Sequence, residues 1–328
     1  MRPSQAVRWA TTDDDAAIRR LCVRTPMRGP ISYCLEREPD FFALTRLQGS
    51  GGGRVAVIDH GSEIVAMAMM APVRAWIGGL ERRCAYIGDL KVDPAHRNSG
   101  LAGRVMSFLG RELQREGIDL SFFLALAGNP AMQLIEASPG DSPGRFEVRK
   151  LRTIRNFLVP FGAPRGSKSG VVVSRATPES VPEMIAFWNR SHRLRSFAPV
   201  LDEEFFEHWL SGPLSLGDFR VARREGVITG FCAVWDASTI KQIRLLRLST
   251  GLRVATALYN IASGLRGRPR FPRAGGHLRF LYVSHVCAER PEDLETLLAY
   301  VHDQYRGDRK STRLNSSHIQ KSRMPSSA

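Results

Sequence analysis

The chain has 328 residues, of which 43% are hydrophobic and 24% charged, and its formal net charge is +15. At roughly 150 residues per domain this length predicts two domains, and the composition is ordinary for a globular protein. No apolar run reaches the roughly 18 residues of a membrane span, and no signal-peptide pattern or CxxC pair is present. These features predict neither a membrane span nor a disulfide framework, and they favour a cytoplasmic location.

A linker rich in Gly, Ser and Pro is expected at residues 162–170, between two segments with the same order of elements. Each segment opens with a strand, a polar turn and a helix, continues with a helical stretch that contains a Phe pair, and then forms a hairpin. The offset between the copies stays at roughly 165 residues, which indicates a repeated unit. The matching stretches are 7–21 and 171–188, 38–47 and 202–210, and 54–70 and 220–235.

The two Phe pairs, Phe41–Phe42 and Phe205–Phe206, occupy equivalent places in the two copies. Adjacent aromatic rings inside a helical period are expected to pack in a core. The alternative is that they line a ligand-binding cleft.

Beyond the hairpins the two copies differ. The first continues with a strand that ends near Val92, a helix over Leu101–Glu116, a strand over Asp119–Leu126 and closing strands. The second inserts a basic amphipathic segment, Thr239–Arg266, before its last strand and a helix over Pro291–Tyr305. We expect the insertion to cover the second sheet as a helix; the alternative is contact with an anionic surface.

The stretch KVDPAHRNSGLAGRVM, residues 91–106, joins a strand to a helix through a turn with few large side chains. Unpaired N–H groups at a helix N-terminus attract anions, and Gly100, Ala102 and Gly103 would let an anion approach them. Arg97 adds a positive charge. The sequence therefore predicts a phosphate or pyrophosphate site, although neither the Walker A motif nor GxGxxG is present.

The pattern Arg97-x-x-Gly100-x-Ala102, with an L-x-V-x-P run upstream and an amphipathic helix downstream, resembles motif A of the GNAT superfamily of N-acetyltransferases. The element order of residues 7–160 is also similar to that family. The resemblance implies an α/β fold of the α+β type, with two tandem GNAT-like domains that each have a mixed central sheet flanked by helices.

The second copy looks degenerate. Its corresponding turn, VCAERPEDLETL, has no Gly, and Glu289, Glu292 and Asp293 would repel a phosphate. It would serve as a scaffold or as a wall of the acceptor site. The expected division is a catalytic domain over 1–161, a linker over 162–170, an incomplete GNAT-like domain over 171–307 and a non-native tail over 308–328.

By the same resemblance, the loop amides would hold the pyrophosphate of acetyl-CoA, and the strand before the loop would pair with the pantetheine arm. Asn129, after the next strand, would also contact the arm. The expected cofactor-binding residues are Leu90, Lys91, Val92, Arg97, Asn98, Ser99, Gly100, Leu101, Ala102, Gly103 and Asn129. No metal is expected, because the histidines lack paired ligand spacing.

Acetyl transfer to an amine needs a base, a donor to the thioester carbonyl and an acid for the leaving thiolate. Asp89 and Tyr86 are the candidate catalytic residues, with Asp89 as the base because an apolar strand would make its carboxylate more basic. The alternative for Asp89 is a structural pair with an arginine such as Arg82 or Arg83. The family commonly has a Tyr acid where this chain has Ile135, so Tyr86 or water would protonate the thiolate.

The resemblance predicts an acyl-CoA-dependent N-acyltransferase that moves an acetyl group from acetyl-CoA to an amine by direct transfer in a ternary complex. The alternative is a protein that binds or senses CoA, or binds through its basic surface, without turnover. The acceptor, the acyl-chain preference and the oligomeric state stay open. A nucleic-acid groove is not expected, since the arginines are scattered without an aromatic-interleaved motif.

The last 21 residues, Asp308–Ala328, resemble the translation of a common sequencing adapter rather than a folding sequence. They carry +4 of the charge, which leaves 15 − 4 = +11 for the rest of the chain. If this tail is foreign, we expect the native protein to continue for roughly 40–50 more residues, judged by the repeat. The second sheet would then end in an unpaired edge, with Lys310–Ala328 disordered.

Overall fold

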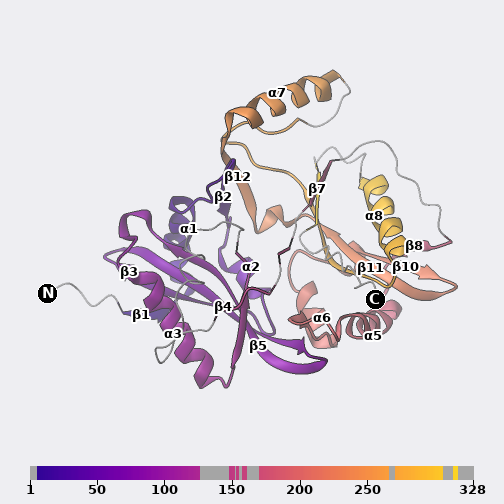
Figure 1. Cartoon of the computed structure of the whole chain (residues 1–328), viewed down its shortest axis with the longest axis horizontal. Helices are drawn as coiled ribbons and strands as arrows, with labels where there is room; N and C mark the ends of the chain where they lie inside the picture. Colours follow the sequence, from indigo (N-terminus) through magenta and orange to yellow (C-terminus); the bar gives the residue numbers. More distant parts are fainter. Residues whose placement is uncertain are drawn as a thin grey trace, which may run out of the picture.

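The computed structural model describes residues 6–125, 148–151, 153–154, 157–160, 170–265, 270–305 and 313–316. In this part of the chain two mixed β-sheets, each built mainly from one half, lie side by side, and a two-stranded ribbon lies above them in the view (Figure 1). Helices flank both sheets. The fold class predicted from the sequence is therefore confirmed.

The first sheet has the order β1-β3-β4-β5-β6, in which β5 and β6 are parallel and the other neighbours antiparallel. Helix α1 packs on one face and α3 on the other, so the central strands are apolar on both faces. The elements of this half are β1 (Val7–Trp9), α1 (Asp15–Arg24), β2 (Ile31–Glu36), α2 (Phe42–Arg46), β3 (Arg54–His60), β4 (Glu63–Ile77), β5 (Leu80–Val92), α3 (Leu101–Arg115) and β6 (Leu120–Phe123).

The second sheet has the order β8-β10-β11-β13-β14-β7, and β13 and β14 form its parallel pair. Helices α5 and α6 lie on one face and α8 on the other. The remaining elements are β7 (Phe157–Pro160), β8 (Val172–Arg175), α5 (Val181–His192), β9 (Ala198–Pro199), α6 (Glu203–Leu210), β10 (Phe219–Arg224), β11 (Val227–Trp235), β12 (Gln242–Leu248), α7 (Thr250–Leu265), β13 (Leu281–Ala288), α8 (Pro291–Tyr305) and β14 (Arg313–Ser316).

The repeat predicted from the sequence is confirmed. Strands β8, β10, β11, β13 and β14 occupy the places that β1, β3, β4, β5 and β6 have in the first sheet, and α8 follows β13 as α3 follows β5. Both predicted hairpins are present, and their turns contain Gly61 and Gly226 at positive φ. Glycine is favoured there because it adopts this conformation without strain.

Two strands lie elsewhere than the sequence predicts. Strand β7, expected to close the first sheet, pairs with β14 in the second. Strand β14, within the expected tail, pairs with β13, so the edge predicted to be unpaired is covered. The physical reason is that a strand edge binds an extended segment through main-chain N–H and C=O groups, which no side-chain pattern reveals. Residues 306–312 and 317–328 lie outside the described residues.

The two halves are joined by strand pairing and by packing. Strand β9 of the second half pairs with β4, and β12 pairs with β2 to form the ribbon. Val73, Ala75 and Cys84 of the first half belong to the same hydrophobic cluster as α5 and α6. The second half therefore forms a wall beside β4 and β5.

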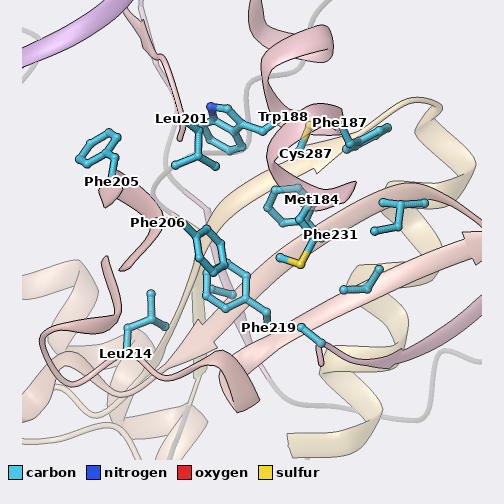
Figure 2. Close-up of a cluster of buried hydrophobic side chains, with 14 of the residues drawn as sticks. Met184, Phe187, Trp188, Leu201, Phe205, Phe206, Leu214, Phe219, Phe231 and Cys287 are labelled. Atoms are coloured by element: carbon cyan, nitrogen blue, oxygen red, sulfur yellow. The ribbon is translucent and has the colours of Figure 1, made fainter. Parts of the chain in front are cut away.

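That shared cluster is rich in aromatic rings (Figure 2). Phe206 is 1% exposed, and its ring centroid lies 5.3 Å from that of Phe219. The ring centroid of Phe205 lies 5.4 Å from that of Trp209. Phe41 is buried in a first-half cluster with Ile18, Leu21 and Cys22 of α1, which we call the α1 cluster. The expected packing role of the Phe pairs is confirmed.

Helix α7 does not cover the second sheet, contrary to the expectation from the sequence. It packs through Leu252 and Tyr259 on Leu245, Leu248 and Phe271, which we call the ribbon cluster. In Figure 1 it projects away from both sheets. The amphipathic pattern predicts the helix correctly, but such a pattern does not specify which surface receives the apolar side.

Candidate active site

The loop predicted to bind an anion joins β5 to α3. After β5 the chain makes one 3-10 turn, Pro94–His96, and Oδ1 of Asp93 accepts a hydrogen bond from the Ala95 N–H at 2.9 Å. Asp93 is buried and pairs with Arg24 of α1, with Oδ2 2.6 Å from Nε. Burial acts to raise the pKa of Asp93, but these two partners hold it below its usual value. A charged cap thus holds the turn in place.

The N-terminus of α3 is open. Gly100 caps it with a φ of 76°, and a Cβ added to Gly100 or to Gly103 would meet no atom within 4 Å. The first N–H groups of a helix have no partner inside the helix. Beside them is a shallow hollow of about 400 Å³, lined by Val7, Gly100, Gly103, Arg104, Ser107, Phe108 and Arg111. Main-chain amides, the helix dipole and two guanidinium groups therefore favour an anionic ligand at this place.

Strand β5 loses one of its two neighbours part-way along. Its parallel pairing with β6 covers only Cys84–Ile87, whereas its pairing with β4 continues to Val92. Strand β5 also carries a bulge, with one residue more than β4, and Asp89 in this bulge has a φ of 49°. Among the residues that the structure describes, none forms a strand on the outer edge of Gly88–Val92, which we call the free edge of β5.

Asp89 forms an ion pair with Arg37, with Oδ2 2.9 Å from Nη2. Both side chains are largely buried, at 18% and 7% exposure. The sequence leaves open an ion pair between Asp89 and Arg82 or Arg83. Asp89 does form an ion pair with an arginine, but the partner is Arg37, while Arg82 and Arg83 are exposed. Arg37 follows β2, 52 residues earlier in the chain, and only the packing of the ribbon beside β5 brings it to Asp89.

Tyr86 lies on the α1 side of β5, where it packs against the α1 cluster. Its ring is 5.5 Å from that of Phe122, and a Cβ on Gly88 would come within 3.0 Å of its hydroxyl. Burial, followed by the charge of Asp89, raises the pKa of Tyr86, so the phenol is protonated at neutral pH. The two predicted catalytic residues are therefore close enough for the charge of Asp89 to act on the Tyr86 phenol.

The second half contributes two residues that sequence reasoning missed. Lys241, just before β12, extends over the ring of Tyr282, with Nζ 5.4 Å from the ring centroid. Burial lowers the pKa of Lys241 to about 8; the charge of Arg37 adds to this and that of Asp89 opposes it. Burial also raises the pKa of Tyr282 to about 12. No local motif marks Lys241, because only the pairing of β12 with β2 brings it beside the first half.

The corresponding turn of the second half is closed. Helix α8 begins at Pro291, and Asp293 in its first turn is fully buried and pairs with Arg224, Oδ1 to Nη2 2.9 Å. The protein's own carboxylate thus occupies the end of the helix that attracts negative charge. An anion finds no open helix end there comparable to that of α3.

The predicted cofactor-binding residues, except Asn129, form one continuous path from the free edge of β5 to the first turn of α3. Leu90 and Arg97 are exposed along this path, as are the residues from Asn98 to Gly100. Asn129 and Ile135 lie outside the described residues, so their roles stay predictions.

The described ranges contain neither a cluster of metal ligands nor a helix that could span a membrane. Within them, no three His, Cys, Asp or Glu side chains are grouped in a way that could hold a metal ion. None of the helices placed there is both long and apolar enough to cross a bilayer.

Residues 32–130 match a family model described as an acetyltransferase (GNAT) domain. This part of the chain belongs to the GNAT superfamily. The match includes β5, the loop and α3, and so contains the motif that carried the resemblance in the sequence. No curated protein sequence matches this chain significantly.

Solved structures of acyltransferases resemble this chain over nearly its whole length. A probable N-acyltransferase from Enterococcus faecalis has a TM-score of 0.51 at 11% identity, over 95% of this chain and 64% of its own. N-myristoyltransferase from Saccharomyces cerevisiae, with bound myristoyl-CoA, has a TM-score of 0.57 at 13% identity, over 96% of this chain and 74% of its own. At these sequence identities the structural similarity shows the fold alone. This chain spans just under two thirds of the length of the Enterococcus protein.

We expect the stability difference between wild type and Lys241→Met to depend on pH. The pKa of Lys241 is about 8 in the fold against 10.5 for an ordinary lysine, so the buried charge destabilises the fold below pH 8. This cost is lost as the pH rises from 8 to 10.5. Lys241→Met should therefore melt above wild type at pH 7, and the gap should narrow by pH 10. An equal gap at both pH values in scanning calorimetry would contradict a buried ammonium at this position.

Proposed function

We propose that this chain is an acyl-CoA-dependent N-acyltransferase that transfers an acetyl group from acetyl-CoA to an amine in a ternary complex. One observation carries the proposal: the free edge of β5 continues through an open loop into the exposed N-terminus of α3. A pantetheine arm that ends in a pyrophosphate needs these two surfaces, a row of main-chain hydrogen-bonding groups and a helix end with unpaired amides. The GNAT match and the acyltransferase fold support it.

In the proposed complex, the pyrophosphate contacts the amides of Leu101–Gly103, with Arg97 nearby. The hollow beside α3, with Arg104 and Arg111, receives the rest of the nucleotide. The pantetheine amides pair with Gly88–Val92 as an added strand pairs with a sheet edge. The open space around Gly100 and Gly103 supports this arrangement, because no side chain there blocks the amides.

In the proposed reaction, the amine lone pair attacks the thioester carbonyl carbon and the C–S bond breaks. The nitrogen loses a proton and the thiolate gains one. Asp89 is the proposed acceptor of the nitrogen's proton, since Arg37 orients its carboxylate beside the free edge of β5. Tyr86, protonated at neutral pH, is the proposed donor to the thiolate. A main-chain N–H of the β5 bulge polarises the carbonyl.

Lys241 offers a second proton acceptor. Because its pKa is about 8, a substantial fraction of its side chain is a free amine slightly above neutral pH. It comes from the second half and lies in the electrostatic reach of Asp89 and Arg37. This supports the reading of the second copy as a wall of the acceptor site rather than as a remote scaffold.

We propose acetyl as the transferred group because aromatic rings pack next to the free edge of β5. Tyr86 lies across Gly88 and contacts Phe122, whose ring centroid is 5.0 Å from that of Phe197. In the proposed complex, these rings would limit the room for a long acyl chain beside the thioester. The yeast N-myristoyltransferase was solved with myristoyl-CoA, which has a long acyl chain. The acyl-chain length that this protein prefers therefore has to be measured directly.

The second candidate function is CoA binding without turnover, and the Asp89–Arg37 ion pair favours it because it engages the proposed base. A thiol-release assay separates the two. With acetyl-CoA and a panel of polyamines, aminoglycosides and peptide N-termini, we expect acceptor-dependent release of CoA. Tight CoA binding in calorimetry without release under any acceptor would assign the chain to the second candidate, and faster release from myristoyl-CoA would overturn the acetyl preference.

The variant Gly100→Glu should weaken acetyl-CoA binding by roughly 100-fold or more, equivalent to about 2.7 kcal/mol. Its carboxylate would stand where the pyrophosphate charge belongs, in front of the amides of α3. Gly117→Glu is the matched control: Gly117 also has positive φ, 65°, and open surroundings, but it follows the other end of α3. Isothermal titration calorimetry should show near wild-type affinity for the control. Unchanged affinity in Gly100→Glu would place the cofactor elsewhere.

The variant Asp89→Asn should lower turnover by roughly 10²–10⁴-fold, the usual scale for the loss of a general base, with little change in acetyl-CoA affinity. Asp59→Asn is the control, because Asp59 pairs with Arg8 on β1 of the same sheet, away from the free edge of β5. A steady-state pH–rate profile measures the effect. If the profile of Asp89→Asn matches that of wild type, the base is Lys241, Tyr86 or water.

A further inference from the structure

Helix α7 has no counterpart in the first half. There the corresponding strands, β4 and β5, are joined by Gly78 and Gly79 alone, whereas β11 and β13 are separated by β12 and α7. Among the described residues, the hydrophobic packing of α7 is through Leu252 and Tyr259 on the ribbon cluster. Figure 1 shows it extending from the β2–β12 ribbon away from both sheets.

The opposite side of α7 is an exposed apolar stripe. Val254, Leu258, Ile261 and Leu265 follow one another at spacings of four, three and four residues, which places them on one face of about three helical turns. Their exposed fractions are 57%, 62%, 64% and 85%. Ser263, on the packed side, is 3% exposed. A row of large aliphatic side chains therefore stands in solvent.

The segment of sequence that contains this stripe is strongly basic. Between Asp236 and Glu289 the sequence has nine Lys and Arg residues and no Asp or Glu. The guanidinium of Arg270 lies against α7, within 3.1 Å of the position that a Cβ on Gly264 would take. Among the described residues of this segment, the exposed arginines are Arg247, Arg253, Arg270, Arg273 and Arg279. A helix with an aliphatic stripe and a basic surround is typical of one that lies in the headgroup region of an anionic membrane.

We propose that α7 docks this protein on an anionic lipid surface, with the apolar stripe at the acyl boundary and the arginines at the headgroup phosphates. Aliphatic side chains offer a nucleic acid neither hydrogen bonds nor stacking. A second copy of the same helix would bring its own positive charges against these. A bilayer with negative headgroups fits both the stripe and the charge. The helix would lie in the plane of the membrane rather than cross it.

Vesicle co-sedimentation of the full chain tests this proposal. We expect the wild type to bind vesicles of phosphatidylcholine and phosphatidylserine at a 7:3 ratio at least about 10-fold more than phosphatidylcholine alone, and less as salt rises. The double variant Leu258→Glu with Ile261→Glu should lose about 10-fold or more of this binding. Leu194→Glu, at a side chain 87% exposed after α5, is the matched control and should bind like wild type.

A second variant isolates the charge. Arg253→Gln with Arg270→Gln keeps the stripe and should weaken binding to the anionic vesicles, while thermal melting checks that each variant is folded. No binding of wild type, or equal binding by wild type and both double variants, would overturn the proposal. Sedimentation velocity without vesicles adds a further outcome: a dimer that Leu258→Glu with Ile261→Glu abolishes would assign the stripe to self-association instead.

Discussion

The change of neighbours along β5 is the constraint on which the proposed site depends. While β6 pairs with Cys84–Ile87, both edges of the strand are satisfied inside the sheet. Beyond Ile87, β4 is the one neighbour among the residues that the structure describes, and the N–H and C=O groups on the other edge have no strand partner in that part of the chain. The bulge at the same point places Asp89 beside Arg37. The free edge, the proposed base and the loop are therefore consecutive parts of one strand and its turn.

The second copy repeats this strand order, but the helix N-terminus that corresponds to the start of α3 is different. Helix α8 begins with Asp293, whose carboxylate is buried against Arg224, whereas α3 begins with an open glycine. The second half contributes in other ways: a shared aromatic core beside β4 and β5, and Lys241 and Tyr282 beside the Asp89–Arg37 pair. Its insertion, α7, adds a surface that the first half lacks. Two copies of one fold thus supply different parts of one proposed site.

Local features of this protein were predictable because they arise between residues that are close in the chain. The repeated hairpins follow from alternating apolar runs around Gly61 and Gly226, and the apolar period of α3 follows from its own sequence. The open turn between β5 and α3 was predictable because its small residues, Gly100, Ala102 and Gly103, can be read directly from the sequence. The arginine partner of Asp89 was not predictable, since many arginines are available and Arg37 lies 52 residues away.

The sequence by itself determined the two copies, the hairpins, the helix after the loop and the bareness of the loop, because 3.6-residue and two-residue periods and glycine conformations are local properties. Only the tertiary structure decided that Lys241 lies near Asp89, that β7 joins the second sheet and that α7 leaves an apolar stripe in solvent. Each of these depends on which strand edges meet. Main-chain hydrogen bonds make such pairings nearly independent of side-chain identity, so the choice is made by the packing of the whole molecule.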